Sequence, residues 1–148
     1  MRIMGLDIGT KTIGVAVSDL LGLTAQGITV IRRRTWDEDI RALEEVVKDY
    51  QVEELLIGLP RRTTGAFGPE AERIRAEGDK IGKALGLPVT YWDEWFSTVS
   101  AEQVLLAADV SRKRRREVID RIAAAIILQN YLDSREHQED RQAELEQP

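Results

Sequence analysis

The chain has no cysteine and only one histidine among its 148 residues. Without cysteine it can form neither disulfides nor zinc sites built on thiolates. The histidine, His137, lies in a polar C-terminal segment, so the sequence does not indicate a Ser-His-Asp triad. No apolar run approaches the roughly 20 residues that a membrane-spanning helix needs, and the first residues lack the apolar stretch of a secretory signal. We therefore expect a cytoplasmic protein with no membrane partner.

Positive charge is also scarce: 21 basic residues against 26 acidic ones give a net charge of −5. The sum argues against a nucleic-acid partner, but the distribution matters more. Residues 134–148 contain two Arg and five Asp or Glu. The rest of the chain contains two basic clusters, at residues 32–34 and 112–116. Taken alone, such a run is usually a solvated surface.

A chain of this length fits one domain, which we place at residues 1–133. For the acidic polar tail at 134–148, frayed helix and disorder both remain open. Alternating apolar residues predict three strands joined by short connections, an antiparallel meander. Their ranges are 2–8, 13–17 and about 24–31.

Later segments alternate between helical and extended patterns. Thr35 and Glu38 fit a capping box for a helix that reaches Tyr50. The further elements are a buried strand at 55–59, a helix from Pro69 to Gly86, a strand at 88–92, a helix capped by Ser97 or Thr98 that reaches Ala108, and a last helix at roughly 117–133. The order βββαβαβαα predicts an α/β fold with a mixed five-stranded sheet and helices on both faces.

Asp7 stands within an apolar strand that we expect to be central in the sheet. A carboxylate there costs free energy unless it is paired, hydrogen-bonded or bound to metal. From the strand alone, two roles remain equal alternatives: a metal ligand, or a structural aspartate bonded to the backbone or to Lys11.

Three further acidic residues stand beside two other apolar segments. At about 100° per residue, Asp120 shares a helix face with Ala124, Ile127, Leu128 and Tyr131. An aspartate favoured by the dipole of the first helical turn is the alternative. Asp93 and Glu94 follow the last predicted strand, at the carboxyl end where α/β folds place ligands. Because neighbours on an extended chain point oppositely, we expect one of the two to face inward; two exposed loop acids are the alternative.

Two-metal phosphoryl hydrolysis would explain why acids from distant segments converge. Two Mg²⁺ or Mn²⁺ ions roughly 3.5–4 Å apart activate water and stabilise the leaving oxygen. Such hard cations prefer the oxygen ligands that Asp and Glu provide. The sequence therefore predicts a site for Mg²⁺ or Mn²⁺.

Four segments together resemble the YqgF family, whose members are described as pre-16S ribosomal RNA nucleases and as Holliday-junction-resolvase-like proteins. They are Asp7-Ile8-Gly9-Thr10-Lys11-Thr12-Ile13-Gly14-Val15-Ala16, Ile57-Gly58-Leu59-Pro60, Asp93-Glu94 before Ser97-Thr98, and residues 120–132. The resemblance covers nearly the whole chain except the tail. It implies a ribonuclease-H-like fold and a metal-dependent nuclease whose substrate is the precursor of small-subunit ribosomal RNA.

The resemblance also implies catalytic, metal-binding acids at Asp7, Glu94 and Asp120, and it alone selects Glu94 over Asp93. We expect basic residues to contact the nucleic acid: Lys11, Arg61, Arg62, Arg112, Lys113, Arg114, Arg115 and Arg116. Precursor ribosomal particles are a further expected partner. The chain departs from the family pattern at Trp95, Arg62 and Thr64, where Arg, Asn and Asp are usual. These departures concern substrate contact and leave the acids intact.

Other functions remain as alternatives. A Holliday-junction-type DNA nuclease needs the same metal centre and basic surface, so cleavage of matched RNA and branched DNA must separate the two. A non-catalytic RNA-binding factor of ribosome assembly would show no metal-dependent activity. A phosphotransferase related to sugar kinases and actin would need two copies of this fold around ATP, and 148 residues hold one.

Overall fold

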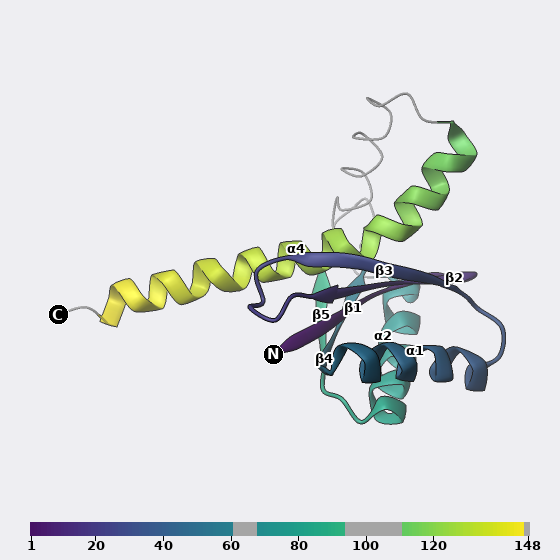
Figure 1. The fold of residues 1–148 in the computed structure, drawn as a ribbon, viewed down its shortest axis with the longest axis horizontal. Coiled ribbons are helices and arrows are strands. Elements are labelled where there is room, and N and C mark those ends of the chain that lie inside the picture. Colours follow the sequence, from purple (N-terminus) through teal and green to yellow (C-terminus); the bar gives the residue numbers. More distant parts are fainter. Residues whose placement is uncertain (61–67, 94–110, 147–148) are drawn as a thin grey trace.

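The computed structural model describes residues 1–60, 68–93 and 111–146 and shows a mixed five-stranded sheet with helices on both faces (Figure 1). The strands lie in the order β3-β2-β1-β4-β5. Their bounds are β1 Arg2–Ile8, β2 Thr12–Ser18, β3 Ala25–Arg32, β4 Val52–Leu59 and β5 Val89–Asp93. β1, β2 and β3 pair antiparallel, and β4 pairs in parallel with both β1 and β5. The predicted meander and mixed sheet are confirmed.

The central strand β1 separates two hydrophobic cores because successive side chains point to opposite faces. Met4, Leu6 and Ile8 join the core under α1 (Trp36–Tyr50) and α2 (Pro69–Leu85). On the other face, Ile3 belongs to a second core, to which α4 (Arg112–Glu146) contributes Leu128. Figure 1 shows α4 on one side of the sheet, with α1 and α2 on the other.

The ends of α1 and α2 follow the local sequence signals. The Thr35 hydroxyl accepts a hydrogen bond from the backbone N–H of Glu38 at 3.2 Å, as an N-cap does. Pro69 occupies the first turn of α2, where a missing N–H costs nothing. Gly86 ends that helix with φ at 69°, a left-handed conformation that glycine adopts without strain.

The last helix is longer than the sequence pattern predicts. It starts at Arg112 instead of about residue 117, and it continues through the tail to Glu146. The Ser111 hydroxyl accepts from the backbone N–H of Arg114 at 3.4 Å, so Ser111 is in N-cap position. The basic run is rich in Arg, a good helix former, and can therefore continue the helix. Of the two states left open for residues 134–146, the structure shows helix.

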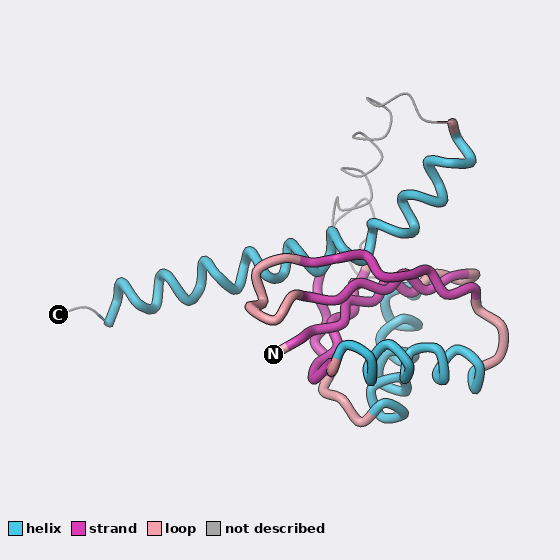
Figure 2. Tube along the Cα trace, in the orientation of Figure 1, coloured by secondary structure: helices cyan, strands magenta, loops and turns pink. Residues whose placement is uncertain are grey.

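The final turns of α4 extend beyond the sheet (Figure 2). Among the side chains of α4 that the structure describes, Leu132 is the last buried one, and the residues after it in the sequence are mostly polar. Within the described ranges, no helix is both long and apolar enough to cross a membrane. The helix predicted from Ser97 or Thr98 to Ala108 lies outside the described residues.

Candidate metal centre

Asp7 lies near the carboxyl end of β1, half-buried, on the sheet face that α4 covers. Its partner across β2 is Gly14, and Gly58 on β4 follows Ile57, the partner of Leu6. Glycine has no side chain, so the two residues directly beside Asp7 on the neighbouring strands place no side chain next to its carboxylate. The carboxylate oxygens of Asp7 are hard donors of the kind that a divalent cation such as Mg²⁺ prefers. The sequence pattern does not reveal that these two glycines flank Asp7, although both stand in motifs that resemble those of the family.

Strand β5 presents its side chains alternately to α2 and to α4. The Tyr91 hydroxyl lies 2.7 Å from the carbonyl oxygen of Arg75 and also bonds to Asp79, both on α2. Burial, and then the Asp79 carboxylate, raise the pKa of Tyr91 and keep its hydroxyl neutral. Trp92 instead packs edge-on against Tyr131 of α4, with ring centroids 5.5 Å apart. Asp93 therefore shares the α2 face with Tyr91, opposite the face of Asp7.

Helix α4 runs antiparallel to β1 across this face. Near the start of β3, the side chain of Gln129 accepts from the N–H of Ala25 at 2.9 Å and donates to the carbonyl oxygen of Leu23 at 3.0 Å. Further along β1, a Cβ on Gly5 would come within 3.0 Å of the Leu128 Cβ and 3.4 Å of the Ala124 carbonyl oxygen. Position 120 comes one turn before Ala124, so the backbone of α4 passes towards the Asp7 end of β1.

Arg33 stabilises the turn after β1, although from the sequence it is only one member of the basic cluster at residues 32–34. The Gly9 N–H donates to the Thr12 carbonyl oxygen at 2.8 Å and closes the turn. The Arg33 guanidinium donates to the Gly9 carbonyl oxygen at 2.7 Å and forms an ion pair with Glu77 of α2. The Arg33 N–H donates to the Lys11 carbonyl oxygen at 2.9 Å. Arg33 thus links α2 to the turn between β1 and β2, and this turn carries the exposed Lys11.

Several predicted site residues lie outside the described part of the chain. They are Glu94, Arg61 and Arg62, together with the departures Thr64 and Trp95. Within α4, Arg114 is exposed, and position 120 is described by its backbone alone. Among the side chains that the structure describes, no three acids, histidines or cysteines gather as a metal site. The centre of three acids therefore stays a prediction. Of its members, the structure describes only the side chain of Asp7.

Residues 1–134 match the family described as RuvX, Holliday junction resolvase. The chain belongs to this family. A protein of Moorella thermoacetica is 59% identical over 133 residues, which cover 90% of this chain and 95% of the relative. A protein of Heliobacterium modesticaldum is 54% identical over 137 residues, 93% and 92% of the two chains. Both relatives carry the name "Putative pre-16S rRNA nuclease". The resemblance to the YqgF family and the nuclease class are confirmed.

Solved structures confirm the fold of this RuvX-family chain. Thermus thermophilus RuvC in complex with a Holliday junction superposes with a TM-score of 0.53 at 17% identity, over 91% of this chain and 96% of RuvC. The fowlpox virus Holliday junction resolvase gives 0.50 at 15% identity, over 90% and 99%. At such identities the likeness establishes the ribonuclease-H-like fold and nothing finer. Nucleases of the resolvase-like class in general depend on divalent metal ions.

Proposed function

We propose that this chain is an endonuclease that trims the 5′ end of pre-16S ribosomal RNA with Mg²⁺ or Mn²⁺ as its cofactor. Asp7, Glu94 and Asp120 would hold the metal. One observation carries the proposal: Asp7 lies near the carboxyl end of the central strand, between glycines of the two neighbouring strands, on the face along which α4 approaches. The shared name of the relatives supports RNA as the substrate. In this role the protein would act in the cytoplasm on precursor ribosomal particles.

Two arrangements support the choice of acids. Alternation along β5 turns Asp93 towards α2, which leaves Glu94 as the acid of the pair for the Asp7 face. Position 120 lies one helical turn from Ala124, which packs over Gly5 of the strand that carries Asp7. Bound metal would supply an activated water and stabilise the leaving oxygen. The chain itself would fix the carboxylates on a rigid strand and helix, and it would bring the phosphate in with basic side chains.

The basic run at 112–116 is proposed to contact phosphates because it forms the first turns of the helix that carries Asp120. Helical periodicity assigns the positions of this run to different faces of the helix. Positions 113 and 116 share the face of position 120, whereas positions 114 and 115 lie on other faces. The cations nearest the metal would therefore come from Lys113 and Arg116, with the others contacting phosphates further out.

We expect the double variant Lys113→Ala/Arg116→Ala to bind RNA more weakly and to show a flatter salt dependence. Each lost phosphate contact reduces the slope of log K against log salt by about 0.7 for single strands and 0.9 for duplexes. Fluorescence anisotropy in EDTA across a range of salt measures this slope. Arg114→Ala/Arg115→Ala removes the same charge and should cut the slope by less than the first pair does. An unchanged slope in both variants would mean that the run is only a solvated surface.

The activity itself is tested by cleavage of a pre-16S 5′-leader RNA and of a branched DNA of matched sequence, each with Mg²⁺, Mn²⁺ or EDTA. We expect metal-dependent cleavage of the RNA. The family description favours one other substrate, the Holliday junction. Preferential cutting of branched DNA would support that function instead. No cleavage of either substrate with either metal would leave a non-catalytic RNA-binding factor as the better account.

Metal should also stabilise the fold. A ligand that binds only the native state at a hundredfold excess over Kd adds about 2.7 kcal/mol, which corresponds to roughly 5–10 °C in Tm for a chain of this size. Without metal, neighbouring carboxylates repel one another. Asp7→Asn should therefore melt no lower than wild type in EDTA and shift less with Mn²⁺. If the variant melts well below wild type and neither protein responds to metal, Asp7 is a structural residue.

A further inference from the structure

A shallow groove of about 840 Å³ lies between the start of α1 and one face of α2, on the side of the sheet away from α4. Arg73, Lys80 and Lys83 line it from α2, and Trp36 lines it from α1. The Arg33–Glu77 ion pair lies in the same lining. The groove thus gathers four basic residues and one acidic residue on a chain whose net charge is −5.

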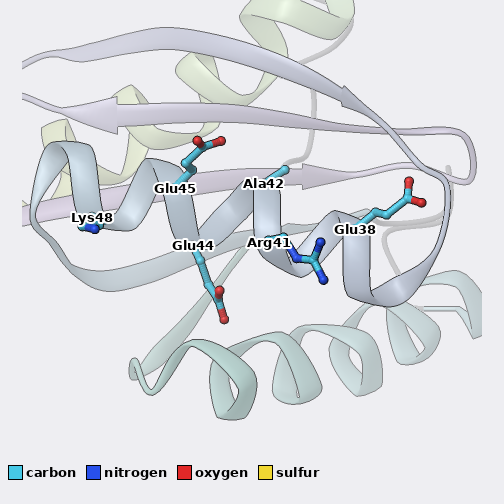
Figure 3. A pocket seen from close by; sticks show the side chains of 6 residues that line it. All are labelled: Glu38, Arg41, Ala42, Glu44, Glu45 and Lys48. Atoms are coloured by element: carbon cyan, nitrogen blue, oxygen red, sulfur yellow. The ribbon is translucent and has the colours of Figure 1, made fainter.

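The charges of this groove are open to a ligand. Arg73, Lys80 and Lys83 are exposed, and in the described part of the chain none of them takes part in an ion pair. Trp36 is 42% exposed beside them. A different hollow, lined by α1 alone, shows the contrast (Figure 3). Its lining residues are Glu38, Arg41, Ala42, Glu44, Glu45 and Lys48, with more acids than bases.

Proteins bind single-stranded nucleic acid with a row of basic side chains beside an exposed aromatic ring. Positions 73, 80 and 83 of α2 lie on one side of the helix and span roughly 15 Å at 1.5 Å per residue. A row of this length can contact several phosphates of an extended strand. A tryptophan face can stack any base, so such a surface needs no particular sequence.

We propose that this α1–α2 groove, named here the Trp36 groove, holds a single-stranded stretch of the substrate. The phosphates would contact Arg73, Lys80 and Lys83, and one base would stack on Trp36. The proposal deepens the proposed function and rests on it for the identity of the substrate. Arg33 links the two regions, because it lines the groove and also binds the carbonyl oxygen of Gly9, two residues after Asp7. A strand cut at Asp7 continues over this turn into the groove.

The test measures binding apart from cleavage. A fluorescently labelled single-stranded RNA without secondary structure is titrated in EDTA with wild type, with Trp36→Ala and with Lys80→Ala/Lys83→Ala. We expect Trp36→Ala to weaken binding roughly 5- to 100-fold, the range for one stacked base, and Trp36→Phe to restore most of it. The lysine pair should lower the salt slope by about 1.4. Arg41→Ala/Lys48→Ala, which removes the same charge from the acidic hollow, should bind like wild type.

A second arm distinguishes this proposal from the nuclease proposal. The same proteins are assayed for metal-dependent cleavage of the leader RNA at saturating concentration. Weaker binding by the groove variants with wild-type kcat supports the groove. If wild type cleaves nothing but the binding pattern holds, the groove stands and the nuclease proposal fails. If the groove variants bind as wild type does, or if the Arg41/Lys48 control weakens binding equally, the groove proposal is wrong even where cleavage is confirmed.

Discussion

Asp7→Asn should reduce kcat/KM for metal-dependent cleavage by at least about 100-fold while the protein stays folded. Losing even an outer partner of a metal ligand costs up to about 100-fold in affinity or activity, and Asp7 is proposed to touch the metal itself. The amide keeps the shape of the side chain but removes the charge that attracts the cation. Initial rates on the leader RNA across a range of Mn²⁺ concentrations measure the effect, with circular dichroism to verify folding.

Asp93→Asn is the matched control. It removes one carboxylate from the same edge of the sheet, but Asp93 shares the α2 face with Tyr91. We expect its activity per folded molecule to stay within about twofold of wild type, as for a substitution away from the site. Glu94→Gln should instead lose activity as Asp7→Asn does. If the Asp93 and Glu94 variants lose activity equally, the two acids cannot be assigned different roles. If Asp7→Asn keeps full activity, the proposed metal centre is wrong.

The fold was predictable because local signals agreed with one another. Apolar alternation in β1 and β2, the Thr35 cap, Pro69 and Gly86 each set an element boundary that the structure confirms within one or two residues. The start of α4 was missed because its first turn is a basic run without an apolar periodic face. Its signal was Ser111, a good N-cap residue immediately before that run.

The site was only partly predictable, because its geometry depends on register between strands. The sequence showed an aspartate in an apolar strand, but only pairing brings Gly14 and Gly58 to its two sides. Similarly, the pattern could not select Glu94 over Asp93, since alternation needs a reference residue of known direction. Within β5, Trp92 packs against α4 and Tyr91 bonds to α2, and these two contacts supply that reference. The role of Arg33 was invisible because it depends on Glu77 in a distant helix.

Gly5→Val should have the second large effect on stability and activity, because it disturbs the contact between β1 and α4. A Cβ at Gly5 would lie 3.0 Å from the Leu128 Cβ and 3.4 Å from the Ala124 carbonyl oxygen, and valine adds two methyl groups beyond it. Overpacking of this kind costs about 1–3 kcal/mol, and here it acts on the helix that carries position 120. We expect Tm to fall by roughly 3–10 °C and activity per folded molecule to fall as well, because the helix must move away from the strand of Asp7.

Gly78→Val separates lost stability from a displaced site. Its Cβ would lie 2.7 Å from both the Ile57 Cδ1 and the Tyr91 hydroxyl oxygen, so it strains the packing of α2 on the opposite face of the sheet. Both variants should melt lower, but Gly78→Val should keep its activity per folded molecule at temperatures well below its Tm. If Gly5→Val keeps that activity too, the spacing between β1 and α4 does not control the site, and Asp120 loses its proposed place beside Asp7. Loss confined to Gly5→Val means that the α4 packing which completes the second core also sets the distance between the two acids.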